Sequence, residues 1–262
     1  MTVGDERTAL MTAPAAEPVV LGAAADAGDV HAAAGELARG RAVVHRFGTV
    51  RALTCRPGRE DVARARLLAG RPEGPEGGVT TAPDALAGLF DWTRLPAELP
   101  RRPLRQLMEE LAELGPFGFR GPAADRVPEH LTSVRDGVRT VRAVTPGLAC
   151  PSHAFLAAAL DRTGTGLLFT LGVEGAPERA DEAAARRRFP HHAPVPVTVL
   201  AFHRAVGYGR AGLPALALER PGSLSVEHLR SMAANHGFAL APAPAGAPAA
   251  GAARVYAPSV RR

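Results

Sequence analysis

Histidine is the first residue type to consider for catalysis or metal binding, and this chain of 262 residues contains nine. His191 and His192 are adjacent, so their side chains point in different directions, and no second pair stands nearby at a spacing that suits a metal. His45 falls in a predicted strand and His153 near a predicted helix start, where a structural role is more common than a catalytic one. The histidines therefore predict no metal site.

Compact catalytic motifs are also absent from the sequence. Cys55 and Cys150 lack CxxC or Cys/His spacing, so neither a disulfide framework nor a zinc site is indicated, and a cytoplasmic location is the expectation. The P-loop, GxSxG and HExxH patterns do not occur. Glu109, Glu110 and Glu113 have the helical spacing of a solvated face. The residue patterns alone therefore assign no catalytic residue and predict no bound cofactor.

Arginine supplies the basic charge of this protein, because its 31 basic residues include no lysine. Against 26 acidic residues they leave a formal net charge of +5, which favours anionic partners such as nucleotides, nucleic acid or acidic membrane surfaces. The abundance of arginine, alanine, glycine and proline is also typical of a GC-rich coding sequence, so both interpretations stay open. Since no long apolar run is present, we expect no membrane partner.

Hydrophobic periodicity predicts the elements that must position these side chains. It favours helices over 26–38, 59–68, 83–89, 104–114, 152–160, 179–188 and 225–235. Short runs rich in β-branched residues predict strands over 42–47, 50–55, 137–144, 166–170, 195–202 and 215–218. This alternation predicts one α/β (α+β) domain with a twisted mixed sheet flanked by helices.

Composition sets the expected limits of that domain at 26–240. Residues 1–18 have the small, polar or Ala/Pro-rich character of a disordered lead-in, and 241–262 form an Ala/Pro-rich tail whose bias begins at Ala239. Inside the domain, a loop rich in glycine and proline covers 72–81, and loops of this kind often carry function.

Several segments follow the order of a known set of motifs. The segment VVHRFGTVRAL at 43–53 is similar to vvafPTETVYGL, and RLLAGRP at 66–72 to iyelKGRP. Further matches to GPLTL, vRvPdhpfl, plvsTSANlSGeP and ilRpG fall at 115–119, 149–156, 166–177 and 218–222. In this order the chain resembles the Sua5/YrdC/YciO family, which has the threonylcarbamoyl-AMP synthase fold. The resemblance implies a single YrdC-like domain with a basic concave surface.

The resemblance also implies an activity and its partners. Enzymes of this family join threonine, bicarbonate and ATP into threonylcarbamoyl-AMP, which serves a tRNA adenosine modification. ATP would then be a substrate, with Mg²⁺ as a possible companion, and RNA, either tRNA or double-stranded RNA, a possible partner. In such a reaction the protein mainly positions the nucleotide and stabilises charge.

Carried over by position, the resemblance implies two groups of site residues. The nucleotide phosphates would be bound by Arg71, Thr170 and Arg220. Arg66 would join them, because it shares a helical face with Ala69, which stands where the family has a lysine. The small-substrate pocket would be formed by Thr49, Arg51 and Phe47. The plainer interpretation makes Arg66 and Arg46 surface arginines, and Thr49 and Thr170 ordinary strand residues.

Several family positions have changed their chemistry. Arg46, Phe47 and Gly48 stand at the PTE positions, and the tyrosine, lysine, arginine and asparagine of the later motifs are replaced by Arg51, Ala69, Ala149 and Gly172. No shift of alignment restores them, since the chain has no lysine and its one asparagine is Asn235. Three hypotheses follow: a synthase with an altered site, a non-catalytic paralogue that binds a nucleotide or double-stranded RNA, and a related transferase with a different small substrate.

Overall fold

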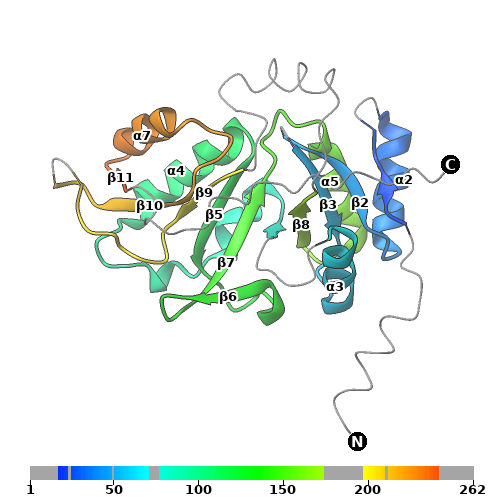
Figure 1. The fold of residues 1–262 in the computed structure, drawn as a ribbon, viewed down its shortest axis with the longest axis horizontal. Helices are drawn as coiled ribbons and strands as arrows, with labels where there is room; N and C mark the ends of the chain where they lie inside the picture. Colours follow the sequence, from blue (N-terminus) through cyan, green and yellow to red (C-terminus); the bar gives the residue numbers. More distant parts are fainter. Residues whose placement is uncertain are drawn as a thin grey trace, which may run out of the picture.

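The computed structural model describes residues 17–22, 25–48, 50–70, 77–173, 197–209 and 212–241. These residues form one mixed sheet with the strand order β1-β2-β3-β8-β4-β7-β5-β9-β10-β11, and β6 pairs with β7 (Figure 1). The strands are β1 Val19–Val20, β2 Val43–Phe47, β3 Val50–Cys55, β4 Gly78–Thr80, β5 Phe117–Pro122, β6 Thr132–Arg135, β7 Val138–Thr145, β8 Leu168–Gly172, β9 Thr198–Ala201, β10 Ala215–Arg220 and β11 Ala239–Ala241.

Both parallel and antiparallel pairs occur in this sheet. The pairs β1–β2, β4–β7, β5–β9 and β10–β11 are parallel, whereas β2–β3, β3–β8, β4–β8, β5–β7, β6–β7 and β9–β10 are antiparallel. The predicted mixed α/β architecture is therefore confirmed.

Helices cover both faces of the sheet. The α-helices are α2 Ala27–Ala38, α3 Arg59–Leu68, α4 Arg101–Leu114, α5 Ser152–Thr163 and α7 Val226–Asn235, and the 3-10 helices are η1 Pro83–Leu89, η2 Trp92–Arg94 and η3 Glu129–Leu131. Helices α2 and α5 share a hydrophobic cluster with Val43, Phe47 and Leu168 on one face. Helices α4 and α7 share a second hydrophobic cluster, which contains Val79, and α3 belongs to a third, which contains Phe169. Val79 and Phe169 are register partners and lie on the opposite face of the sheet.

Local sequence explains where several of these helices begin and end. Asp26 and Asp29 form a reciprocal capping box at the start of α2, and the Ser225 hydroxyl accepts the His228 N–H at the start of α7. Gly164 ends α5 in the left-handed conformation. None of the described helices has the length and apolar character needed to cross a membrane.

The predicted elements recur with shifted bounds, and some expectations are corrected. The predicted helix at 83–89 is a 3-10 helix. The segment from Ala239, whose composition resembled the tail, begins with β11. Strand β5 was missed because two glycines and a proline lower its strand propensity. A side chain at Gly121 would approach Phe202 to 2.1 Å, so glycine is required there by packing. The predicted helix 179–188 and residues 1–16 and 242–262 lie outside the described residues.

Candidate functional site

A small open cavity lies where β4 begins, and arginines from three elements converge on it. Arg66 comes from α3, Arg120 from β5 and Arg142 from β7. The remaining described lining consists of Gly77, Gly78, His130, Leu131, Thr132, Ser133 and Phe169, so no carboxylate lies among the described lining residues. The volume is about 40 Å³, which suits water or part of an anion. We call this feature the arginine cavity.

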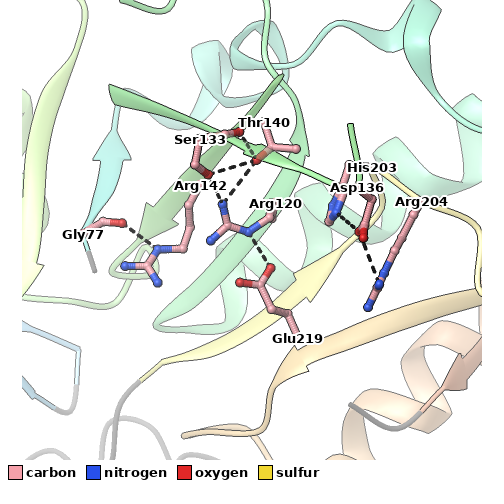
Figure 2. Close-up of polar contacts among 9 residues, drawn as sticks. All are labelled: Gly77, Arg120, Ser133, Asp136, Thr140, Arg142, His203, Arg204 and Glu219. Carbon is pink, nitrogen blue, oxygen red and sulfur yellow. Dashed lines mark hydrogen bonds and ion pairs between the residues drawn. The ribbon is translucent and has the colours of Figure 1, made fainter. Parts of the chain in front are cut away.

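Two of these arginines face each other across neighbouring strands. Arg120 of β5 is the register partner of Arg142 of β7. Like charges placed directly opposite in an antiparallel pair destabilise a sheet unless another charge offsets them. Glu219 on β10 supplies one such charge, because its carboxylate accepts the Arg120 Nε–H at 2.5 Å (Figure 2). Glu219 thus offsets part of the like charge of this pair.

The side chain of Arg120 is buried and held by several polar groups. Its Nη1 donates to Ser133 Oγ at 3.1 Å and to Thr140 Oγ1 at 3.4 Å. Burial by itself raises the pKa of the Glu219 carboxyl, but the hydrogen bond and charge of Arg120 outweigh it, so that this pKa lies below its usual value. The pair is therefore ionised at neutral pH, and it fixes the Arg120 guanidinium beside the cavity.

Arg142 is positioned by the backbone of β4. Its Nε donates to the Gly77 carbonyl at 2.6 Å (Figure 2). Glycine is required here, because a side chain at Gly77 would lie 2.2 Å from the Phe169 ring and one at Gly78 would lie 2.7 Å from Val144. Gly77, just before β4, and Gly78, its first residue, let the chain approach both neighbours closely, and Arg142 reaches the cavity wall there.

Arg66 reaches the same cavity from α3. Its guanidinium carbon lies 5.6 Å from the centroid of the Phe169 ring, within the range of a cation–π interaction. Its Nε is buried, and it has no hydrogen-bond partner among the described residues. Since a buried N–H without an acceptor is costly, an incoming oxygen would satisfy it. The predicted nucleotide contact of Arg66 is consistent with this position.

The β6–β7 hairpin forms another wall of the arginine cavity and is tied to the end of β9. Asp136 at the hairpin turn has φ +51°, and its carboxylate lies 3.1 Å from His203 Nε2 and 3.3 Å from Arg204 Nη1 (Figure 2). Burial lowers the pKa of His203 more than Asp136 raises it. These contacts hold β6, and with it Thr132 and Ser133, in place.

A second polar feature, which we call the hydroxyl row, lies within the sheet. It consists of His45, Thr54, Thr170 and Thr80, on β2, β3, β8 and β4, and all four are buried. His45 Nε2 lies 2.7 Å from Thr54 Oγ1, which lies 2.8 Å from Thr170 Oγ1, and the Thr80 hydroxyl donates to Thr170 at 2.9 Å. The row lies on the same face of the sheet as Arg142. Gly78 is the register partner of Thr170, and the next residue, Val79, is the register partner of Ala143, so the neighbours Gly78 and Arg142 lie on the face that holds Thr170.

The direction of the hydrogen bonds in this row follows from His45. Its Nδ1 lies 3.1 Å from the Arg46 carbonyl, which can only accept, so the hydrogen is assigned to Nδ1. Burial lowers the pKa of His45 to about 4, so the ring is neutral at pH 7 and Nε2 accepts from Thr54. Thr54 then accepts from Thr170. The Thr170 hydroxyl therefore has no hydrogen left to donate to a phosphate.

The other predicted site residues lie in different surroundings. Phe47 is buried in the hydrophobic cluster of α2 and α5, and Arg51 is exposed on β3 as the register partner of Arg46. Arg220 donates from Nε to the Val197 carbonyl and is not among the described cavity lining. Thr49 and Arg71 lie outside the described residues. Of the predicted residues that are described, only Arg66 lines the cavity.

Arg120 and Arg142 are the residues that motif reasoning missed. The motif match placed the family arginine at Ala149, which lies beyond the end of β7, whereas Arg142 lies on β7 and lines the cavity. The usable signal was an arginine between apolar residues in a predicted buried strand, as in Val141-Arg142-Ala143.

No resident metal site accompanies these arginines in the described part of the chain. It contains no group of three or more histidine, cysteine or acidic residues placed to hold a metal ion. Asp136 and Glu219 already contact His203, Arg204 and Arg120. The described residues therefore do not fit a Mg²⁺ site of their own, while His191 and His192 lie outside the described residues.

Comparison with known proteins identifies the fold. No family model matches the chain, and neither does any curated protein. Two solved structures of P. abyssi Sua5, a variant and a complex with L-threonine, each match with a TM-score of 0.52 and 16% identity over 86% of this chain. The chain has a Sua5-like fold. It spans 62% of the length of that Sua5 protein.

A further solved structure, E. coli YciO, covers 71% of this chain and 89% of its own, with a TM-score of 0.49 and 14% identity. The expected family resemblance is confirmed as a Sua5-like fold. At these identities the likeness concerns the fold and not the activity.

Proposed function

We propose that this Sua5-like protein binds the phosphates of ATP at the arginine cavity and uses ATP in a reaction of the threonylcarbamoyl-AMP synthase type. The observation that supports the proposal is the convergence of Arg66, Arg120 and Arg142 on one cavity without a carboxylate among its described lining. Guanidinium groups suit phosphate because their planar N–H donors match its oxygens. The protein lacks lysine, so arginine must supply this charge.

Each cavity arginine would have its own role. Arg142, fixed by the Gly77 carbonyl, would fix a phosphate next to β4. Arg66, with its buried Nε and its contact to Phe169, would approach from the opposite side. Arg120 would add positive charge from β5, while Glu219 and Ser133 hold its guanidinium group in a fixed orientation. Any Mg²⁺ would arrive with the nucleotide, held by phosphate oxygens and water.

The cavity must open for this role. Its volume of about 40 Å³ is too small to enclose a nucleotide, for which pockets span roughly 300–1,000 Å³. The phosphates would therefore occupy the cavity while the nucleoside lies outside it.

Calorimetric titration with ATP tests the binding part of the proposal. We expect Arg142→Met to weaken ATP binding about tenfold or more, because a charge-assisted hydrogen bond contributes roughly 1.5–3 kcal/mol. Arg59→Met, on the exposed start of α3, removes the same charge away from the cavity and should bind ATP as the native chain does. Equal affinity in the native chain and both variants would contradict the proposed site.

The reaction is tested separately by the release of diphosphate. The protein is incubated with ATP, bicarbonate and threonine, and diphosphate should appear only when all three are present. If ATP binds but another amino acid is needed in place of threonine, the related transferase with a different small substrate is supported instead. If ATP binds and no amino acid gives diphosphate, the synthase assignment is wrong.

The replaced family positions favour a second candidate, a non-catalytic paralogue that binds a nucleotide or double-stranded RNA. Ala69 and Gly172 lack the functional groups of the lysine and asparagine in the motifs that they match. Such a protein would bind RNA through phosphate contacts, and its affinity would fall steeply as salt rises. An affinity for RNA that does not change with salt would exclude this mechanism.

A further inference from the structure

Among the described lining residues of the arginine cavity, His130 is the one whose side chain can change its charge near neutral pH. The three arginines keep their charge throughout that range, and the glycine, leucine, serine, threonine and phenylalanine residues beside them carry none. The charge state of His130 therefore decides whether the cavity binds an anion with the same affinity at every pH.

Local structure fixes the place of His130 at the cavity wall. It is the middle residue of η3 and is half-buried. The next residue, Leu131, packs against two of the hydrophobic clusters. The Thr132 hydroxyl donates to the Glu129 carbonyl at 2.7 Å, which closes the turn around His130. These contacts hold the imidazole ring beside the arginines.

The loop before α3 determines which ring nitrogen of His130 carries a hydrogen. Nε2 lies 2.7 Å from the Pro57 carbonyl oxygen, which can only accept a hydrogen bond. The hydrogen of a neutral ring is therefore assigned to Nε2, and its Nδ1 then has a lone pair and no hydrogen. Because Nε2 is bonded to Pro57, Nδ1 is the ring nitrogen that remains for a ligand.

This assignment has a consequence for any anion that contacts the ring. A neutral imidazole would present its Nδ1 lone pair to an anion oxygen, and the two would repel each other. An imidazolium has a hydrogen on both nitrogens, so it can keep the bond to the Pro57 carbonyl and donate from Nδ1 to the anion. A nearby anion also favours the charged form of a histidine. Contact between the anion and Nδ1 therefore requires a proton.

The charged groups around His130 come from several elements. Those that line the cavity with it are all cationic: Arg66 of α3, Arg120 of β5 and Arg142 of β7. Glu219 of β10 contacts Arg120 from outside the described lining, and Glu129, the neighbour of His130 on η3, is exposed. With no carboxylate among the described lining residues, an anion that enters the cavity is the acceptor for the imidazolium.

We propose that His130 is a fourth anion-binding group of the arginine cavity, which binds as an imidazolium and takes up one proton from solvent as the anion enters. The inference rests on the anion-binding role proposed for the cavity and adds a pH dependence to it. Because the coupling between two bound species is reciprocal, a proton on His130 strengthens anion binding as much as the anion favours the proton. Anion affinity should therefore rise as pH falls through the range in which histidine titrates.

Calorimetric titration with sulfate tests the proposal. Sulfate stays fully ionised between pH 6 and 8, so any proton taken up on binding goes to the protein. Titrations in two buffers with different heats of ionisation measure this uptake, and the native chain should gain a fraction of a proton per sulfate at pH 7. Its sulfate affinity should be about fivefold to tenfold higher at pH 6 than at pH 8, the size of a charge-assisted hydrogen bond.

Three variants separate this role from a structural one. His130→Gln keeps an N–H for the Pro57 carbonyl but gains no proton, so its sulfate affinity should be low and independent of pH. His130→Arg is charged at every pH and should bind sulfate as tightly at pH 8 as at pH 6. His31→Gln removes an exposed histidine of α2, outside the described lining, and should behave like the native chain. Thermal melting shows whether each variant is folded.

The outcomes distinguish this inference from the proposed function. Equal sulfate affinity at pH 6 and 8 without proton uptake, or no sulfate binding at either pH, would overturn the role of His130. Uptake that persists in folded His130→Gln would also overturn it and would assign the proton to another group, such as His203, whose charge interacts with that of Arg120. ATP is titrated in parallel. If ATP binds and the effect of His130 is missing, only the inference fails. If the effect is present and ATP does not bind, only the ATP proposal fails.

Discussion

The hydroxyl row lies on the same face of the sheet as Arg142 of the arginine cavity, but the polar groups of the row and of the cavity are satisfied in different ways. In the hydroxyl row each hydrogen is directed to a neighbour, from Thr80 through Thr170 and Thr54 to His45. In the arginine cavity three guanidinium groups gather, no carboxylate lies among the described lining residues, and Glu219 contacts Arg120 from outside that lining. A network that is complete within the protein contributes to stability, whereas excess charge of one sign around a cavity favours a ligand.

This contrast divides the expected effects of substitution between stability and ligand binding. Changes in the hydroxyl row should alter the free energy of unfolding and leave ATP affinity alone. Changes of Arg66 should do the reverse, whereas changes of Arg142 should affect both, since its Nε also binds the Gly77 carbonyl. Arg120 belongs to both groups, since it lines the cavity and forms a buried ion pair.

Arg120→Met is the test with the largest expected effect. Glu219 would lose its partner while still mostly buried, and removing one member of a buried ion pair typically costs about 3–5 kcal/mol. Urea unfolding should show a loss of this size, and ATP binding should also weaken. Adding Glu219→Gln to the variant removes the stranded charge and should restore part of the stability. If the single variant unfolds like the native chain, the pair does not stabilise the sheet.

The pH dependence of unfolding tests the buried state of His45. Its pKa falls from 6.5 to about 4 on folding because the ring is buried, so the unfolded chain binds more protons between these values. This contribution to stability is complete above pH 6.5 and is lost as pH falls toward 4, by up to about 3 kcal/mol. Urea unfolding at pH 7, 6 and 5 should show a smaller decline in His45→Gln than in the native chain.

His203 provides a matched background for that comparison. Its pKa is also lowered by burial, so it contributes to the same decline in both proteins. The difference between the two curves therefore belongs to His45 alone. Parallel curves would mean that folding does not lower the pKa of His45, so the ring would become protonated in the folded protein as pH falls through its ordinary pKa.

Thr54→Val tests whether the hydroxyl row serves stability only. Valine keeps the shape but removes the hydrogen to His45 and the acceptor for Thr170, at a cost of about 1–3 kcal/mol. Ser231→Ala, which removes an exposed hydroxyl on α7, should change stability by less than about 0.5 kcal/mol. ATP affinity should be the same in both variants and the native chain. A marked loss of ATP affinity in Thr54→Val would show that the row reaches the ligand.

Periodicity and motif order were enough to predict the mixed architecture, because hydrophobic faces and capping residues are local signals. The bounds of α3 match the prediction, and α2 begins at the residue after its capping Asp26. β5 was hidden, because Gly118 and Gly121 are selected by close packing and not by strand propensity.

The candidate site was less accessible to sequence reasoning than the fold. Arg120 and Arg142 meet through strand register, which no local pattern reveals. Motif matching predicted ligand contacts for Phe47 and Thr170, and it could not show that both are buried, one in a hydrophobic cluster and the other in the hydroxyl row. Sequence similarity indicated positions along the chain, whereas convergence in space depended on the register of the sheet.

Arg66→Met gives the smallest expected effect and the sharpest separation of the two regions. Methionine can keep the apolar contact with Phe169 but removes the charge and the buried Nε–H, which has no partner among the described residues. Unfolding free energy should change by less than about 0.5 kcal/mol, while ATP affinity falls about tenfold, which corresponds to about 1.4 kcal/mol. Arg66→Lys keeps the charge without the planar donors and should fall between the two. Arg66 is distant from Arg120 and Arg142 in sequence, and it lies on a helix whereas they lie on strands. A loss of ATP affinity in the Arg66 variant would therefore show that the convergence of arginines, and not the ion pair of Arg120, makes the cavity a binding site.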